Sequence, residues 1–329
     1  MNISTNNKKY AIAVIFNDAY VPGAFVFLKT FLKYNPWYNG DIVCFYDNKY
    51  CCISDENKNN FQKIFPNLYF KYVDYHIYDK FVEHFYEKMT FKRFIVSAYT
   101  LEAFALKYDR NGNEYDKVVF LDIDQIIEGD LSLLFLHDKD IVAAPGDNFL
   151  INDINEDALF YRDVKNINMS GGLFSISKKY LGENIRNEII KFGETFEFDK
   201  PEYGKCNGNG FEMHVLDIWF RDKDLWITSS IYAYPSIIFY YNYSDKIFRT
   251  IAYKLFENSR IIHIWGDKPW LKTEIDKKII IDSYWENIYN AEINKKEPIR
   301  LKEFFDGILQ YDDNIYKENE NLKLVTNFL

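Results

Sequence analysis

The first fifty residues alternate short apolar, β-prone runs with an amphipathic helix, and this alternation restricts the chain to an α/β fold. Residues 10–16 (YAIAVIF) and 41–46 (DIVCFY) are typical of buried strands. Between them, apolar residues recur at helical spacing over residues 24–32, and an Asn-Pro pair ends the helix. A strand, a helix and a strand in this order predict a sheet covered by helices.

The rest of the chain continues this pattern less regularly. Further buried strands are expected at residues 69–72, 118–121, 141–144, 173–176 and 261–264, and helices at residues 94–106 and 275–288. The glycine-containing stretch 193–210 predicts a long surface loop, and the polar residues 311–321 predict a tail. We find no internal repeat and no Pro- or Ser-rich linker. The sequence therefore predicts one catalytic domain over residues 1–270 and a C-terminal helical extension and tail over residues 271–329.

Charge and composition exclude several classes of protein. Lys and Arg total 40 against 49 Asp and Glu, and the net charge of -9 argues against a broad surface for nucleic acid or anionic membrane. No apolar run reaches the roughly 18 residues of a transmembrane helix, and the N-terminus lacks the apolar stretch of a signal peptide. The four cysteines, Cys44, Cys51, Cys52 and Cys206, have no zinc or redox spacing. These features predict a cytoplasmic location, in the source cell or an infected host cell, with reduced thiols.

Two carboxylates directly follow the predicted strand 118–121. Asp122 and Asp124 flank Ile123, and side chains at i and i+2 of a strand point the same way, so both carboxylates can face one site. Ligands of open α/β sheets bind beyond the carboxyl ends of the strands, and two hard oxygen donors suit Mg²⁺ or Mn²⁺. Asp-Lys-Asp also occurs at 138–140 and 222–224, where solvated loop charges are expected. From these residues alone, metal binding and a capping or turn role stay equally open.

Four segments, taken in order, resemble glycosyltransferase family 8, the group that contains glycogenin and bacterial lipopolysaccharide galactosyl- and glucosyltransferases. The segment VVFLDIDQIIEGDLSLLF (118–135) resembles the metal-binding Asp-x-Asp segment of the family. NDAYVPGAFVFLKTFLKYN (17–35) resembles its first turn and helix, most closely that of glycogenin. NMSGGLFSIS (168–177) resembles its central strand. HIWGDKPW (263–270) resembles its His-x-x-Gly-x-x-Lys-Pro-Trp signature, with one residue instead of two between Gly266 and Lys268.

The resemblance implies a GT-A fold, which is a Rossmann-like mixed sheet sandwiched by helices, and transfer of a hexose from a UDP-sugar with retention of configuration. It implies Mn²⁺, with Mg²⁺ as the alternative, held by Asp122, Asp124 and His263. The residues implied to contact the donor are Asn17, Ala19, Tyr20, Arg93, Asp122, Ile123, Asn168, Ser170, Gly171, Gly266 and Lys268. Within this set, Tyr20 would stack on the uracil ring and Lys268 would contact the diphosphate. The register at Arg93 is open, because Lys92 is adjacent.

A further segment departs from the family pattern in its residue types. The family usually carries Asp-Gln near the sugar and acceptor, and the aligned residues here are Glu212 and Met213. Glu212 keeps a carboxylate on a longer side chain, whereas Met213 loses an amide; the adjacent His214 is an alternative polar group. The resemblance implies that Glu212, Asp124 and Lys268 act in the transfer, and the departure leaves the identity of the sugar open.

Two other functions remain as alternatives. A nucleotidyltransferase also pairs carboxylates at a strand end with a divalent ion, but it usually has a basic, Gly-rich loop where this chain has NDAYVPGAF. A catalytically silent sugar-binding module is the second alternative. The expected acceptor is a glycan or a protein, and the chain itself is one candidate because it has 27 tyrosines. A homodimer is also left open.

Overall fold

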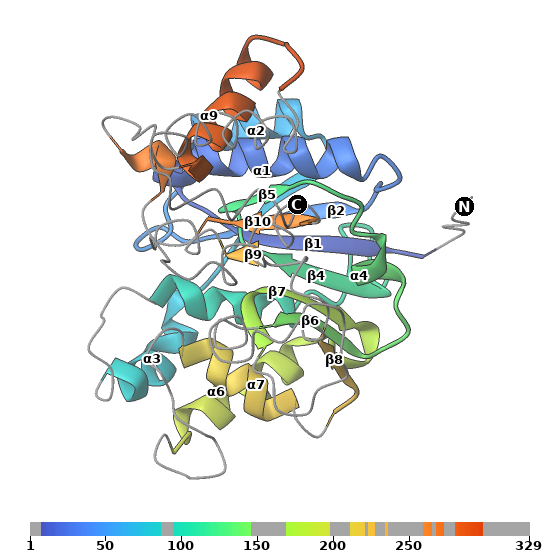
Figure 1. Cartoon of the computed structure of the whole chain (residues 1–329). Helices are drawn as coiled ribbons and strands as arrows, with labels where there is room; N and C mark the ends of the chain where they lie inside the picture. Colours follow the sequence, from blue (N-terminus) through green and yellow to red (C-terminus); the bar gives the residue numbers. More distant parts are fainter. Residues whose placement is uncertain are drawn as a thin grey trace, which may run out of the picture.

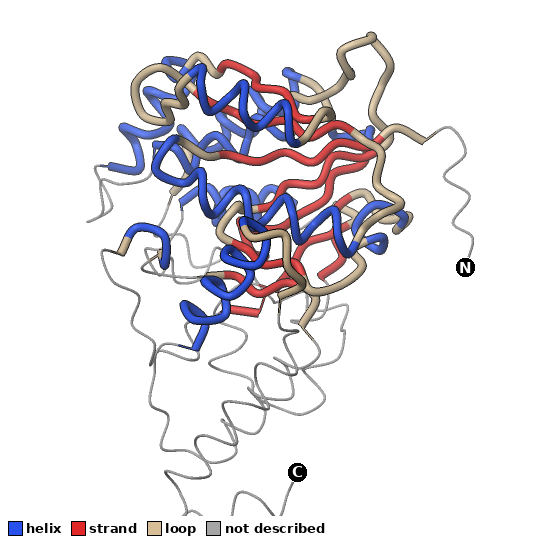
Figure 2. Tube along the Cα trace, turned by 90° about the horizontal axis from the view of Figure 1, so that it is seen from above, coloured by secondary structure: helices blue, strands red, loops and turns tan. Residues whose placement is uncertain are grey.

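The computed structural model describes residues 8–86, 95–145, 169–197, 211–220, 223–227, 234–235, 259–264, 268–272 and 280–298. Its centre is a seven-stranded mixed sheet with the strand order β3-β2-β1-β4-β7-β6-β8. Its strands are β1 (Tyr10–Ile15), β2 (Asp41–Tyr46), β3 (Leu68–Tyr72), β4 (Lys117–Leu121), β6 (Ile141–Pro145), β7 (Met169–Ser177) and β8 (Leu225–Ile227). The first four are parallel, whereas β7 runs antiparallel to both β4 and β6. Figure 2 shows the strands side by side with helices around them.

Helices cover both faces of this sheet, so the predicted α/β sandwich is confirmed (Figure 1). One layer contains α1 (Val21–Tyr34), α2 (Asp55–Ile64), α4 (Ser132–Leu136) and α9 (Ile280–Ile293). The other contains α3 (Asp79–Tyr86), the 3-10 helix η3 (Ile95–Ala103), α6 (Glu183–Glu194) and α7 (Phe211–Phe220).

The side chains of β1 show how the sheet builds two cores. Ile12 and Val14 point into the core beneath α1, whereas Ala11 and Ala13 point into the core beneath η3. Alternate side chains of a strand face opposite sides of the sheet, so a strand with helices on both faces is apolar throughout. The small alanines lie where η3 packs directly against β1.

A second, three-stranded sheet has the order β5-β10-β9, and its strand β5 packs against α1 (Figure 1). It contains β5 (Gln125–Ile127), β9 (Tyr234–Pro235) and β10 (Ile261–His263). Helix α1 fixes the β5 segment through two buried side chains. Thr30 Oγ1 accepts from Ile127 N at 3.1 Å, and Asn35 Oδ1 accepts from Leu131 N at 2.7 Å. These bonds set the position of the chain that directly follows Asp124.

Helix α9 packs against α1, although the two helices are far apart in the sequence (Figure 1). Phe25 and Tyr289 meet edge to face with ring centroids 6.3 Å apart, and Lys29 Nζ lies 3.7 Å from Glu292 Oε2. The predicted C-terminal helix is therefore present over Ile280–Ile293. The division into domains at residue 270 stays a prediction.

The helix predicted over residues 94–106 is present over Ile95–Ala103 as a 3-10 helix, because the hydrogen bonds there join residues three apart, as from Phe104 N to Leu101 O. The start of the predicted loop at residue 193 is wrong, since α6 continues to Glu194. The rest of that loop, from residue 198 to 210, and the predicted tail at 311–321 lie outside the described residues.

The other expected strands are present within one residue of their predicted ends, except that β7 begins at Met169, four residues before the predicted start. Cys44, Cys51 and Cys52 are free thiols, and Cys206 lies outside the described residues. No helix in the described part of the chain combines the length and apolar character that a membrane span requires.

Candidate active site

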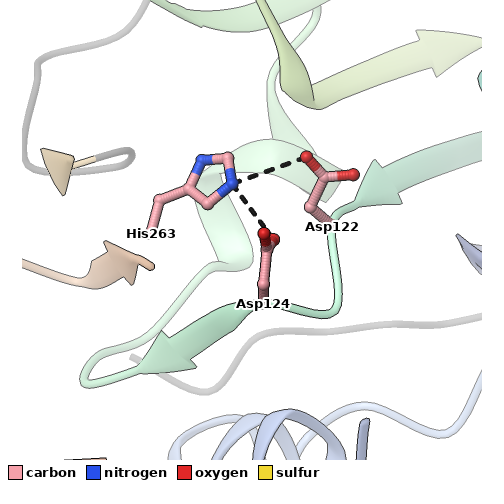
Figure 3. Close-up of side chains that lie close together, drawn as sticks. All are labelled: Asp122, Asp124 and His263. Atoms are coloured by element: carbon pink, nitrogen blue, oxygen red, sulfur yellow. Dashed lines mark ion pairs between the residues drawn. The ribbon is translucent and has the colours of Figure 1, made fainter. Parts of the chain in front are cut away.

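Asp122 and Asp124 lie on the short connection between β4 and β5, at the carboxyl end of β4 (Figure 3). Asp122 N donates to Gly172 O on β7 at 3.0 Å, and Ile264 N donates to Asp124 O at 2.7 Å. Ile123, between them, is buried in the core beneath α1. The backbone is thus fixed on both sides, and the two carboxylates are left to face the same space.

His263, the last residue of β10, completes a three-residue cluster with these carboxylates. His263 Nε2 lies 3.1 Å from Asp124 Oδ1 and 3.5 Å from Asp122 Oδ2 (Figure 3). One ligand atom from each side chain lies within 4.8 Å of the other two. The side chains of His263 and Asp124 are 9% and 15% exposed, whereas that of Asp122 is 38% exposed. The cluster is therefore open to solvent chiefly on the Asp122 side.

The strand β7 leaves room for this cluster because residue 172 is a glycine. A Cβ atom at Gly172 would lie 2.5 Å from Asp122 Oδ2 and 2.7 Å from His263 Cε1. The carbonyl oxygen of Gly172 also accepts from Gln125 Nε2 at 2.8 Å, in addition to Asp122 N. A glycine here thus allows the close approach of two ligands while its backbone holds the Asp-x-Asp segment.

Lys268 enters the same cluster from the segment after β10. Its Nζ donates to Asp124 Oδ2 at 2.5 Å and to Ile264 O at 2.5 Å. The side chain of Lys268 is 12% exposed. Asp124 therefore lies between a lysine ammonium and an imidazole, both within contact distance.

The neighbouring charged groups shift the pKa values of Asp124 and His263 more strongly than burial does. Burial alone would raise the pKa of Asp124, but His263 and Lys268 outweigh it and hold that pKa well below its usual range. Burial alone would lower the pKa of His263, but Asp124 and then Asp122 raise it above its usual value. Asp124 is thus ionised in the folded protein and available as a ligand.

The donor set fits a divalent metal ion. Two carboxylates and one imidazole are ligands that Mn²⁺, Mg²⁺ and related ions accept, and three protein ligands leave open positions for a substrate. The close grouping of ligand atoms, and the space that Gly172 leaves beside them, support this use. The cluster of Asp122, Asp124 and His263 is therefore a candidate metal centre.

The residues expected at the base of the nucleotide lie in the turn between β1 and α1. Tyr20 ends the 3-10 turn η1 (Asp18–Tyr20), and its ring meets that of Trp270 edge to face with centroids 5.8 Å apart. Asn17 Oδ1 is buried and accepts no hydrogen bond among the described residues. A buried amide oxygen without a donor is costly, so this atom is suited to a ligand. Ala19, beside it, is exposed.

Several expected site residues are described only in part or not at all. Ser170 is buried on β7, where its Oγ accepts from Gly172 N at 3.2 Å, and Gly171 lies between these two residues. Glu212 lies in the first turn of α7, with Met213 and His214 next to it and partly buried. The side chain of Glu212 and the residues Lys92, Arg93, Asn168 and Gly266 lie outside the described part of the structure.

Sequence reasoning did not single out three residues that now contact the cluster or the turn: Gln125, Gly172 and Trp270. Gly172 and Trp270 lie inside segments that carry the family resemblance, but nothing local distinguishes them from their neighbours. Gln125 follows Asp124 directly, and its buried amide could have been suspected, because a polar residue on a buried strand needs a partner.

Comparison with known proteins gives fold relatives only. No family model matches the sequence, and no curated protein matches it. Among solved structures, galactosyltransferase LgtC in complex with donor and acceptor sugar analogs has a TM-score of 0.56 at 16% identity, covering 85% of this chain and 95% of LgtC. The glycosyltransferase GlyE of Streptococcus pneumoniae TIGR4 has a TM-score of 0.52 at 19% identity, covering 88% and 66%.

Mouse xyloside xylosyltransferase 1 is a third structural neighbour, with a TM-score of 0.51 at 10% identity, covering 78% of this chain and 98% of that enzyme. All three are glycosyltransferases by name, and this chain shares their overall fold. The structural similarity establishes the fold, but at identities this low the activity has to be argued from the site. The chain has the GT-A fold of glycosyltransferases.

Proposed function

We propose that this chain is a metal-dependent, retaining glycosyltransferase. It moves a hexose (glucose, galactose or N-acetylglucosamine) from a UDP-sugar to a glycan or protein acceptor. The observation that carries the proposal is the cluster of Asp122, Asp124 and His263 at the carboxyl end of β4. In an open α/β sheet this edge is where nucleotides bind, and a divalent ion there serves a diphosphate.

The proposed metal ion is Mn²⁺, with Mg²⁺ as the alternative, held by Asp122, Asp124 and His263. The imidazole in the ligand set favours Mn²⁺, because Mg²⁺ prefers oxygen ligands. When bound, such an ion offsets the negative charge of a diphosphate leaving group. Lys268, 2.5 Å from Asp124, adds a second positive charge at the same point.

Tyr20 and Asn17 are the proposed contacts of the uracil base. Tyr20 supplies a ring for stacking, and the buried Oδ1 of Asn17 supplies an acceptor for the imide N–H of uracil. Both lie between β1 and α1, on the same edge of the sheet as the metal cluster, since β1 and β4 are adjacent and parallel. The backbone next to Ala19 belongs to the same turn.

Retention is proposed to occur by front-face attack. The acceptor hydroxyl attacks the anomeric carbon as the bond from that carbon to the diphosphate oxygen breaks, and the departing diphosphate accepts the hydroxyl proton. A double displacement would need a carboxylate at the anomeric carbon, and among the residues matched to the family pattern Glu212 is the candidate. Glu212 is proposed to orient the sugar, together with Asn168 and Ser170.

Incubation with individual UDP-sugars and Mn²⁺, with detection of released UDP, tests the proposal. We expect release with at least one UDP-hexose and none in excess EDTA. Proton NMR of the product should give an α-linkage from an α-linked donor, and a β-linkage would refute retention. Mass spectrometry of the purified protein tests whether the chain carries its own sugar. Binding of a UDP-sugar without any transfer would instead support a silent sugar-binding module.

A further inference from the structure

The segment of residues 268–272 joins the metal cluster to helix α9. At its first residue, Lys268 Nζ lies 2.5 Å from Asp124 Oδ2. At its last residue, Lys272 Nζ lies 2.5 Å from Asp282 Oδ2, in the first turn of α9. The Asp282 side chain is completely buried, and a buried charge that loses its partner is strongly destabilising. Both ends of the segment are therefore attached to carboxylates, one in the site and one on α9.

The middle of the segment is held by Trp270. Its indole lies directly over Gly23 of α1, where a Cβ atom would come within 2.5 Å of Trp270 Cζ2. The same indole contacts Tyr20 on one side, with centroids 5.8 Å apart, and Trp285 of α9 on the other, with centroids 5.4 Å apart. Trp285 in turn stacks on Tyr289, with centroids 4.9 Å apart. Trp270 thus connects the turn that bears Tyr20 with α9.

Helix α9 has anchors of its own that do not involve this segment. Tyr284 Oη donates to Glu128 Oε1 at 2.6 Å, next to the end of β5. Lys29 and Lys33 of α1 form ion pairs with Glu292 and Glu297, in and after α9. The helix is therefore fixed on the body of the protein at several points and can serve as a support for the segment.

We propose that α9 positions the nucleotide-binding side chains, with Trp285 and Asp282 as positioning residues that act through Trp270 and Lys272. This inference rests on the proposed function, because the side chains positioned are Lys268, at the diphosphate, and Tyr20, at the base. Side chains that are mobile before binding lose conformational entropy when a ligand orders them, and this weakens binding. Contacts with α9 order the segment already in the free protein, so that binding of a nucleoside diphosphate is stronger. Helix α9 then contributes to nucleotide binding, although it lies outside the sheet that bears the metal cluster.

The experiment compares Trp285→Ala and Asp282→Asn with the control Tyr284→Phe, which removes a different contact of the same helix. Isothermal titration with UDP and Mn²⁺ measures nucleotide affinity. Hydrogen exchange without nucleotide measures order at two hydrogen-bonded amides of the segment, Leu271 N to Lys268 O and Lys272 N to Pro269 O. We expect the two test variants to bind UDP roughly 2- to 30-fold more weakly and to exchange these amides faster, with the control unchanged in both measurements.

Trp285→Phe keeps an aromatic ring against Trp270 and should restore most of the affinity lost in Trp285→Ala. If Trp285→Ala does not fold, Asp282→Asn carries the same comparison. If both test variants bind UDP as tightly as the wild type, the inference is overturned while the proposed function stands. The same holds if Tyr284→Phe loses as much UDP affinity as the test variants. A wild-type protein that binds no UDP in the presence of Mn²⁺ overturns the proposed function itself, and the inference with it.

Discussion

Gly172 on β7 lies so close to Asp122 that a Cβ atom at residue 172 would be 2.5 Å from the Asp122 carboxylate. Carbon and oxygen atoms cannot approach to that distance, so one of them has to move. We therefore expect Gly172→Ala to displace Asp122 or His263 and to lower Mn²⁺ affinity roughly 10- to 100-fold, the usual effect of disturbing residues that support metal ligands. Titration of Mn²⁺ by electron paramagnetic resonance measures this affinity.

Gly129→Ala is the matched control for this substitution. A Cβ atom at Gly129 would meet Arg260 Cγ at 2.9 Å, a similar crowding against a side chain that does not belong to the metal cluster. We expect it to lower stability without changing Mn²⁺ affinity. Equal losses of affinity in both variants would show that crowding acts through general destabilisation.

The two carboxylates of the cluster should respond differently to amide substitution. Asp124 is 15% exposed and contacts both Lys268 and His263, whereas Asp122 is 38% exposed. We expect Asp122→Asn and Asp124→Asn both to abolish most Mn²⁺-supported release of UDP. Only Asp124→Asn should also lower the free energy of unfolding, because it leaves the largely buried Lys268 ammonium facing a neutral amide. Urea denaturation measures this difference, and activity of either variant that survives excess EDTA contradicts the metal assignment.

Substitutions of His263 and Lys268 are expected to respond differently to added Mn²⁺. Loss of His263 removes a ligand and lowers metal affinity, so a higher Mn²⁺ concentration should partly restore UDP release in His263→Ala. Loss of Lys268 removes a charge proposed to act on the leaving group, so added Mn²⁺ should not restore Lys268→Ala. Titration of Mn²⁺ at saturating UDP-sugar checks this, and equal rescue of the two variants would falsify the separate roles.

Tyr20 is expected to contribute through the face of its ring. Tyr20→Ala should weaken UDP binding by roughly 1–3 kcal/mol, the usual scale for stacking of a base on an aromatic side chain. Tyr20→Phe keeps the ring and its edge-to-face contact with Trp270, so it should retain most of the affinity. Calorimetric titration with UDP measures both, and wild-type affinity in the alanine variant rules out the ring as the base platform.

Glu128 gives the protein a pH dependence of stability that lies outside the metal cluster. Burial raises the pKa of Glu128 to about 7, although Tyr284 and Tyr34 donate hydrogen bonds that lower it. Between the ordinary glutamate pKa of 4.5 and about 7, the folded state holds a proton that the unfolded state has lost. The free energy of unfolding therefore falls as pH rises through this window, by at most about 1.4 kcal/mol per pH unit, and levels off above it.

Glu128→Gln cannot titrate and should lose this dependence. Urea denaturation at pH 5, 6, 7 and 8 gives the free energy of unfolding at each pH. The wild-type value should fall relative to that of the variant up to pH 7, and the difference between the two should be constant above it. Parallel curves over the whole range would show that Glu128 is ionised throughout in the folded protein.

The parts of the fold that the sequence predicts are those in which pattern and contact are local. The apolar run before Asp122 marks β4, and the Asn-Pro pair after Tyr34 marks the end of α1, because each signal lies within a few residues of its effect. Helix α2 was not predicted, since only Phe61 of its ten residues is buried and no apolar period results. Its one local signal is Ser54, whose side chain accepts from Asn57 N as an N-cap.

The candidate site divides in the same way. The spacing of Asp122 and Asp124 predicts that their side chains point the same way. His263 is predicted as a ligand only through the family resemblance. The closeness of Gly172 to Asp122, and of Trp270 to Trp285, depends on how distant segments pack. A single sequence contains no signal for such contacts, since they are set by the register of β7 on β4 and by the docking of α9.

The order of the strands along the chain has a consequence for how the protein assembles. The last strand of the large sheet, β8, ends at Ile227, whereas His263 and Lys268 follow later, and Lys268 is 144 positions from its partner Asp124. During synthesis, every strand of that sheet therefore emerges before either His263 or Lys268. Until they arrive, the nascent domain holds two neighbouring acidic groups that repel each other. When β10 and the following lysine pack beside the two carboxylates, Lys268 offsets this repulsion, so the step that completes the cluster also creates its electrostatic environment.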